Sequence, residues 1–218
     1  MVAIIGMING WMIAKLNMAP FIATFGMSTI VYGINCLYFA QEPNRSQPIG
    51  GIKESLTILS SYKIFGISLL VYIALLITII VWFVLNRTVY GKHLYIVGGN
   101  KDAAKVSGVN INFIIISAFV IESLLVGFGG VLEVARTGGA NSAYGFSYEF
   151  DAISSCVVGG VSLSGGIGTV PGVIIGVIIF TIISYGLAFI GVNPNWQLII
   201  KGIIICSAVA LDMRKNAQ

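Results

Sequence analysis

Three carboxylates lie within or beside apolar runs of the sequence. Glu122 falls near the middle of the run 113–132, and Glu149 and Asp151 stand at the entry to the run 152–161. A charged side chain in hydrocarbon costs several kcal/mol unless it is paired or hydrated, so such residues often line a polar cavity. The three are therefore candidates for a translocation path. Glu122 has the alternative interpretation of a hydrogen-bonded structural carboxyl.

The segment that leads to these last two carboxylates is aromatic. It carries Tyr144, Phe146 and Tyr148. Aromatic rings stack on the C–H faces of sugars, and carboxylates accept hydrogen bonds from sugar hydroxyls. The same residue types also gather at membrane interfaces. The residues by themselves leave both interpretations open.

Lys201 interrupts the last apolar run, 196–211, five residues after Trp196. Lysine side chains near the end of a membrane helix extend their charge to the interface. We expect Lys201 to snorkel outward in this way.

The sequence shows no constellation for catalysis or metal binding. The single histidine, His93, lies in a polar stretch, and Cys36, Cys156 and Cys206 lie in separate apolar runs without metal-ligand spacing. The glycines of 165–168 lack the lysine of a phosphate-binding loop and a preceding strand. We therefore expect no enzyme activity, no metal and no cofactor.

The composition indicates a membrane protein. Hydrophobic residues make up 57% of the 218 positions and charged residues only 9%, against about 25% charged in a soluble domain. The bilayer must therefore be the solvent of this chain. The net charge of +4 lies in short clusters between apolar runs, which argues against nucleic-acid binding. We predict an all-α, polytopic transmembrane helical bundle that forms a single domain over 1–218.

Apolar runs of about 20 residues predict the spans. The first run is short and predicts a partial helix, and 152–161 crosses only with the help of its flanks. We predict about seven spans: 1–14, 21–40, 64–85, 113–132, 152–161, 170–190 and 196–211.

Basic residues orient these spans, because cytoplasmic loops carry an excess of Lys and Arg. With the polar stretch 91–111 inside, four basic residues fall outside: Arg45, Lys53, Lys63 and Arg136. Seven fall inside: Lys15, Arg87, Lys92, Lys101, Lys105, Arg214 and Lys215. This alternation requires 152–161 to cross, and it places 162–168 and the polar tail in the cytoplasm.

The stretch 91–111 is the longest polar interval between two long apolar runs. Asn100 suits an N-cap, 101–107 is helix-prone, and Gly108 suits the position after a helix end. A short capped helix between two spans has no core of its own to join. It either presents a face to a partner outside the bilayer or is an ordinary loop with one solvated helical turn.

Gly168, Gly172 and Gly176 recur every four residues. Small residues at this spacing share a helix face and allow another backbone to approach closely. We predict that this face packs against a helix of this chain or of a partner chain. A second group in the run 113–132 offers the same possibility: Gly127, Gly129 and Gly130.

Three longer motifs carry a resemblance to one family. They are YIVGGNKDAAKVSGVNI at 95–111, GFGGVLEVARTGGANSAYGFSYEFDAISSCVVGGVSLSGGIGTVPG at 127–172, and YGLAFIGVNPNWQLIIKGIIICSAVALD at 185–212. The chain resembles, over nearly its whole length, the permease subunits of bacterial ribose/galactose-type ABC sugar importers. The ending GVNP-x-WQ-x-IIKG-x-II favours the galactose/methyl-galactoside branch.

The resemblance implies a permease of the bacterial inner membrane, surrounded by lipid, that imports a monosaccharide without altering it. Its implied partners are a periplasmic sugar-binding protein, a separate ATP-binding subunit and a second permease copy. Because family members have additional N-terminal spans, we expect this chain to be N-terminally truncated. The implied coupling loop, within 91–111, docks on the ATPase through Gly98, Gly99, Asn100, Ala103, Ala104 and Gly108.

Other functions stay open on the residues alone. Nothing in the apolar runs excludes a permease for ribose, a nucleoside or a branched-chain amino acid. An ion-coupled secondary transporter with Glu122 as proton carrier is a further alternative. An intramembrane enzyme is disfavoured because the sequence shows no catalytic pair.

Overall fold

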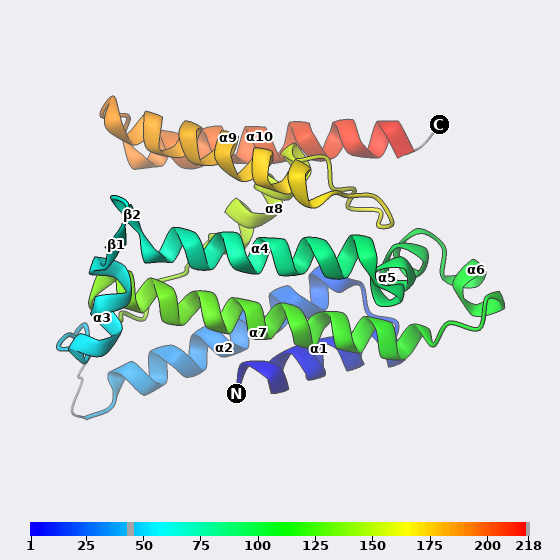
Figure 1. Ribbon diagram of the computed structural model, residues 1–218, viewed down its shortest axis with the longest axis horizontal. Helices are drawn as coiled ribbons and strands as arrows, with labels where there is room; N and C mark the ends of the chain where they lie inside the picture. Colours follow the sequence, from blue (N-terminus) through cyan, green and yellow to red (C-terminus); the bar gives the residue numbers. More distant parts are fainter. Residues whose placement is uncertain (43–45, 217–218) are drawn as a thin grey trace. The chain divides into compact units, whose positions relative to one another are not determined.

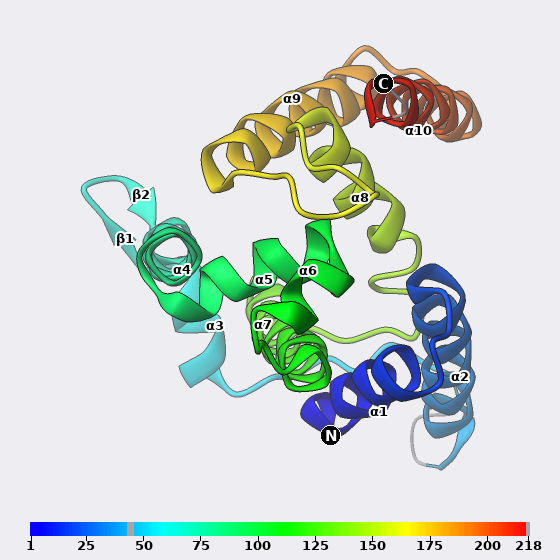
Figure 2. The same ribbon diagram turned by 90° about the vertical axis from the view of Figure 1, so that its right-hand side faces the viewer.

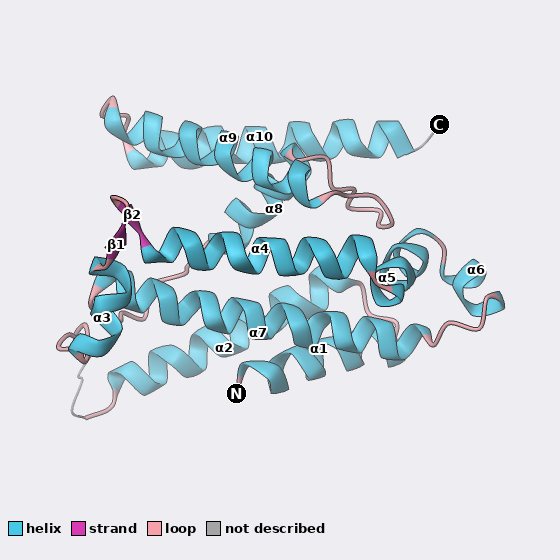
Figure 3. Cartoon of the chain, viewed as in Figure 1, coloured by secondary structure: helices cyan, strands magenta, loops and turns pink. Residues whose placement is uncertain are grey.

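Helices form almost all of the regular structure in the computed structural model, which describes residues 1–42 and 46–216. Among these residues the strands form one short hairpin, as Figure 3 shows. The prediction of an all-α polytopic membrane fold is confirmed. The elements, shown in Figure 1, are α1 (Val2–Lys15), α2 (Pro20–Ala40), α3 (Glu54–Ser61), β1 (Lys63–Ile64), β2 (Ile67–Ser68), α4 (Leu69–Arg87), α5 (Val89–Gly99), α6 (Lys101–Val106), α7 (Ile111–Thr137), α8 (Tyr148–Val158), α9 (Val170–Phe189) and α10 (Pro194–Asn216).

Among the residues that the structure describes, four helices are long and apolar enough to cross a membrane: α2, α4, α7 and α9. The helix α1 is apolar but has 14 residues. With 11 residues, α8 rises about 16 Å, roughly half of a 30 Å hydrocarbon core. The 23 residues of α10 rise about 34 Å. Each predicted span contains one helix, but the first five positions of the predicted span 64–85 lie in the hairpin that precedes α4. The number of crossings stays a prediction.

The long helices bury few side chains. None of the residues of α4 is buried, and Leu76 and Ile79 are more than half exposed. Apolar side chains in this setting need lipid or another apolar surface around them. We therefore expect lipid to cover the exposed apolar side chains of these helices. Of the basic residues used for orientation, Arg45 lies outside the described residues, and so do the side chains of Arg214 and Lys215.

The chain divides into two compact units. The first contains residues 1–83 and 108–144, and the second contains 84–107 and the chain from 145 onward. The polar stretch after α4 is thus grouped with the C-terminal helices.

In the first unit, α1 packs closely along α7. A Cβ atom added to Gly10 would stand 2.7 Å from the Cα of Ile116, and one added to Gly6 would stand 2.5 Å from the carbonyl oxygen of Phe119. No ordinary side chain fits at such distances. Gly6 and Gly10 are four residues apart, so they share the face of α1 that meets α7.

The glycines predicted to offer a packing face on α7 contribute less. A Cβ on Gly127 would stand 2.7 Å from a methyl group of Val2, whereas one on Gly129 or Gly130 would meet nothing within 4 Å. The close approach therefore comes from the glycines of α1.

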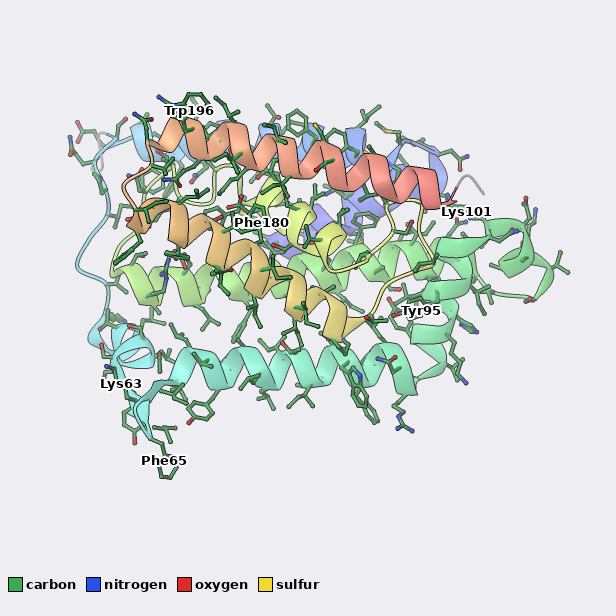
Figure 4. All side chains as sticks on the ribbon, turned by 90° about the horizontal axis from the view of Figure 1, so that it is seen from above. Lys63, Phe65, Tyr95, Lys101, Phe180 and Trp196 are labelled. Carbon is green, nitrogen blue, oxygen red and sulfur yellow. The ribbon has the colours of Figure 1, made fainter. Side chains whose placement is uncertain are left out.

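One end of the first unit is closed by α3, the hairpin and two loops. The hydroxyl of Ser60 donates to the carbonyl oxygen of Ala135 at 2.9 Å. Ile49 and Ala140 exchange two backbone hydrogen bonds of 2.8 Å. The hairpin immediately precedes α4, and Phe65 projects from its turn, 97% exposed (Figure 4).

In the second unit, α8 packs against both α9 and α10. Figure 2 shows α8 crossing beside α9, with α10 adjacent. Thr169 caps α9 by accepting a hydrogen bond from the backbone N–H of Gly172 at 3.2 Å. Pro171 is the second residue of the helix, where its missing backbone N–H would have had no partner in the helix.

Candidate functional site

The polar stretch after α4 contains two helices, α5 and α6, separated only by Asn100. We had predicted α6 but not α5. Three glycines, Gly91, Gly98 and Gly99, make α5 a poor helix by propensity. The signal for it was Thr88, whose hydroxyl oxygen accepts a hydrogen bond from the N–H of Gly91 at 3.2 Å as an N-cap.

The caps predicted for α6 are present. The side chain of Asn100 accepts from the N–H of Ala103 at 2.9 Å, and Gly108 adopts a positive φ of 75° just past the helix end. Ser107 donates its hydroxyl to the carbonyl oxygen of Ala103 at 2.9 Å. The helix ends at Val106, one residue earlier than predicted. A helix of six residues is unstable in isolation, so these caps and contact with α5 define its shape.

The two alanines assigned to docking have opposite environments. Ala104 is fully buried, whereas Ala103 is exposed. Val106 is 90% exposed at the end of the same helix, beside charged Lys101 and Lys105. The exposed surface of α6 therefore carries the small Ala103, the apolar Val106 and charged side chains of both signs.

The end of α5 touches the loop 159–169, which we call the linking loop. A Cβ on Gly98 would stand 2.8 Å from the backbone nitrogen of Gly166, and a Cβ on Gly166 would stand 2.8 Å from the backbone nitrogen of Gly99. Tyr95 adds a hydrogen bond from its hydroxyl to the carbonyl oxygen of Gly168 at 2.9 Å. The two backbones are thus in direct contact, and Figure 4 shows Tyr95 at this junction.

The linking loop is ordered by its own hydrogen bonds. The N–H of Ser162 donates to the carbonyl oxygen of Ile167 at 3.0 Å, and the N–H of Gly165 donates back to Ser162 at 3.2 Å. Val161 donates to the carbonyl oxygen of Cys156 in α8 at 2.9 Å. The loop therefore continues α8 as a compact turn.

The glycines of α9 meet α8. A Cβ on Gly176 would stand 2.9 Å from the Cα of Gly159, and it would also clash with the carbonyl oxygen of Ser155. Gly172 lies against the backbone of Gly159 in the same way. Gly168 precedes α9, and a Cβ added there would stand 3.2 Å from a methyl group of Val161. The helix that receives this face thus belongs to this chain.

Asp151 and Lys201 form an ion pair within the second unit. The Lys201 ammonium lies 2.9 Å from both carboxylate oxygens of Asp151 and 5.6 Å from the ring centre of Phe180. We had expected Lys201 to snorkel outward, but its charge points to a partner on α8. A lone lysine in a sequence gives no sign of a partner 50 positions away.

The position of the pair along α9 follows from the helix contacts. Ser155 lies opposite Gly176 and Gly159 lies opposite Gly172, so α8 and α9 run antiparallel and Asp151 is level with Phe180. Phe180 lies nine residues before the end of α9 at Phe189, which is about 13 Å along a helix. The ion pair is therefore near the middle of a helix that can span the bilayer.

The other predicted carboxylates lie elsewhere. Glu122 is on the exposed side of α7 in the first unit, and Glu149 is exposed in the first turn of α8. Tyr144, Phe146 and Tyr148 are all more than half exposed before and at the start of α8. The structure thus joins only Asp151 of the three carboxylates to an opposite charge, among the residues that it describes.

The part of the chain that the structure describes contains no group of three or more His, Cys, Asp or Glu side chains able to hold a metal ion. The polar features of the second unit are instead a capped surface helix, a backbone contact and an intramembrane ion pair.

Comparison with known proteins gives a consistent result. The profile of the family described as branched-chain amino acid transport system / permease component matches residues 1–209. The galactose/methyl galactoside import permease protein MglC of Escherichia coli K12 is 49% identical over 99% of this chain, and that of Haemophilus influenzae is 48% identical over the same share. The chain spans 65% of the length of each of these relatives.

More distant relatives act on other sugars by name. The ribose import permease protein RbsC of Bacillus subtilis is 36% identical over 96% of this chain and 64% of its own length. No solved structure matches the chain significantly.

Proposed function

Because this chain belongs to the branched-chain amino acid transport system / permease component family, we propose that it is the membrane-spanning permease subunit of an ATP-driven ABC importer. The proposed substrate is a monosaccharide, galactose or a methyl galactoside, delivered by a periplasmic binding protein. The observation that carries the proposal is the identity of almost half of the residues, over 99% of this chain, with two galactose/methyl galactoside permeases. The lower identity to a ribose permease supports the choice of sugar.

The proposed complex contains a separate ATP-binding subunit and a second permease copy, in the bacterial inner membrane. The segment 91–111, with Gly98, Gly99, Asn100, Ala103 and Gly108, is its cytoplasmic coupling loop. The exposed face of α6 supports this assignment, because a capped helix without a core of its own is suited to a partner's groove. The buried Ala104 shapes the segment rather than touching the partner.

The proposed mechanism is alternating access. ATP closes the ATPase dimer, the docked coupling loops move with it, and the spans rock so that the pore opens to each side in turn. The binding protein selects the sugar, so the pore needs little selectivity. Glu122, Glu149 and Asp151 stay proposed residues of the path, and the Asp151 carboxylate also pairs with Lys201.

The proposal is tested by uptake of radiolabelled galactose. A strain without its own galactose and ribose importers would express this permease with the ATPase and the binding protein. We expect uptake to require all three proteins and to be reduced by unlabelled methyl galactoside but not by ribose. Uptake reduced by ribose would assign the permease to that sugar. Uptake that persists without the ATPase and collapses with an uncoupler would contradict the proposal and favour an ion-coupled carrier.

A further inference from the structure

We infer that the linking loop, residues 159–169, transmits movement of the coupling loop to α8, and that the glycine contact between α5 and this loop is the point of transmission. The inference rests on the proposed function, because the movement originates in the ATPase. It assigns a positioning role to Gly165 and Gly166, which the docking assignment does not include.

The contact is suited to transmission because it joins two backbones. A side-chain contact can yield by a change of rotamer, but two main chains in van der Waals contact have no such freedom. A Cβ on Gly165 would stand 3.1 Å from the carbonyl carbon of Gly98, and one on Gly166 would stand 2.5 Å from the Cα of Gly99. Neither Gly165 nor Gly166 has room for a side chain at this contact.

A hydrogen bond also joins α5 to the linking loop, one helical turn from the glycine contact. Tyr95 in α5 donates its hydroxyl to the carbonyl oxygen of Gly168 at 2.9 Å. Gly98 and Tyr95 are three residues apart and therefore lie on one face of α5. Two attachments on one face resist rotation as well as separation of α5 and the loop.

From the loop, movement has a short path into the membrane. The backbone bonds from Gly160 to Val157 and from Val161 to Cys156, both 2.9 Å, join the loop to the last turn of α8. At the other end of α8, Asp151 is bound to Lys201 of α10. Displacement of α5 by the ATPase would therefore shift α8 and pull on α10 near the middle of the bilayer.

The chain offers a matched pair of substitutions for a test. Gly166 and Gly160 both lie in the linking loop with positive φ, 74° and 84°. An alanine at either position suffers the same left-handed backbone strain. Only Gly166→Ala also places a Cβ against α5, since nothing lies within 4 Å of a Cβ at position 160. The difference between the two variants isolates the contact.

The experiment uses the permease reconstituted in liposomes with its ATPase and loaded binding protein. We expect Gly166→Ala to retain the ATPase through purification but to lose at least about tenfold in sugar uptake, equivalent to about 1.4 kcal/mol in the coupled step. Stimulation of ATP hydrolysis by loaded binding protein should fall in parallel. Gly160→Ala should stay within about twofold of the wild type on both measurements.

Tyr95→Phe removes the hydrogen bond between α5 and the linking loop without adding an atom, and we expect a smaller loss of uptake with normal ATPase retention. Equal behaviour of Gly166→Ala and Gly160→Ala would overturn the inference, and so would loss of the ATPase itself from Gly166→Ala, since the contact would then only shape the docking surface. Failure of the wild-type complex to assemble or transport would instead contradict the proposed function.

Discussion

The two neighbouring alanines of α6 differ in exposure, so a substitution at the exposed one tests docking without disturbing the fold. Ala103 is exposed and Ala104 is fully buried. We expect Ala103→Arg to reduce sugar uptake at least about tenfold and to release the ATPase during purification, with the permease level in the membrane unchanged. Ala103→Ser keeps a small side chain and should retain both. Wild-type uptake by Ala103→Arg would remove the outer face of α6 from the docking surface.

The pair Asp151–Lys201 is a stability element whose partners depend on each other. Removing one member of a buried pair costs about 3–5 kcal/mol, because the remaining charge loses its partner. Lys201→Met should therefore lower the unfolding temperature in detergent. The double variant Asp151→Asn/Lys201→Met should recover most of the loss.

An exposed pair gives the control for this double-mutant cycle. Glu133 and Arg136 lie 2.7 Å apart on the surface of α7, with the arginine side chain 54% exposed. Surface pairs contribute about 0–1 kcal/mol, so Glu133→Gln should change the unfolding temperature little. If Lys201→Met were equally mild, the intramembrane pair would not hold α8 to α10.

The contact between α8 and α9 depends on the absence of a side chain at one position. A methyl group at Gly176 would clash with the carbonyl oxygen of Ser155, whereas Gly186 on the same helix has open space around it. Overpacking of this kind costs about 1–3 kcal/mol. Gly176→Ala should therefore lower the unfolding temperature in detergent, while Gly186→Ala should leave it unchanged or raise it, because alanine favours helix. The reverse order would show that α8 does not pack on this face.

Elements defined by local signals were predictable from the sequence, and those defined by distant partners were not. The caps at Asn100 and Gly108 lie within the segment they terminate, so α6 could be placed to within a residue. Helix α5 has a local signal in the Thr88 cap, but its glycines are explained only by their neighbours: Gly91 meets the backbone of α4, and Gly98 and Gly99 meet the linking loop. The four-residue spacing of Gly6 and Gly10 is a signal in the sequence for the close packing of α1.

The candidate site divides in the same way. Lys201 was recognisable as a charge within an apolar run, but its partner lies 50 positions away and became visible only when α8 was placed against α10. Glu122 was also recognisable as a charge within an apolar run, and in the structure it is exposed on α7. Composition identifies an unusual residue, whereas the fold supplies its partner.

For the whole chain, the linking loop bears on the number of crossings. Helix α7 begins just after the coupling loop, and its 27 residues rise about 40 Å, enough to carry the chain across the membrane. The linking loop nevertheless touches α5, which belongs to the proposed coupling loop. We therefore predict that the chain between α7 and the linking loop returns across the membrane. Because α8 covers only about half of the hydrocarbon core, we predict that its flanking segments complete the crossing.

This topology predicts which side of the membrane three introduced cysteines face. In a variant with Cys36, Cys156 and Cys206 replaced by serine, single cysteines would be placed at Phe65, Lys101 and Ser164, all exposed in the structure. The hairpin and α5 lie at opposite ends of α4, so an impermeant maleimide added to intact cells should label only Phe65→Cys. Lys101→Cys and Ser164→Cys should react only after the membrane is permeabilised. Labelling of Lys101→Cys in intact cells would reverse the orientation and remove the coupling assignment. Labelling of both Phe65→Cys and Ser164→Cys in intact cells, without labelling of Lys101→Cys, would show that α8 re-enters the membrane without crossing it. The linking loop could not then contact α5 as it does here.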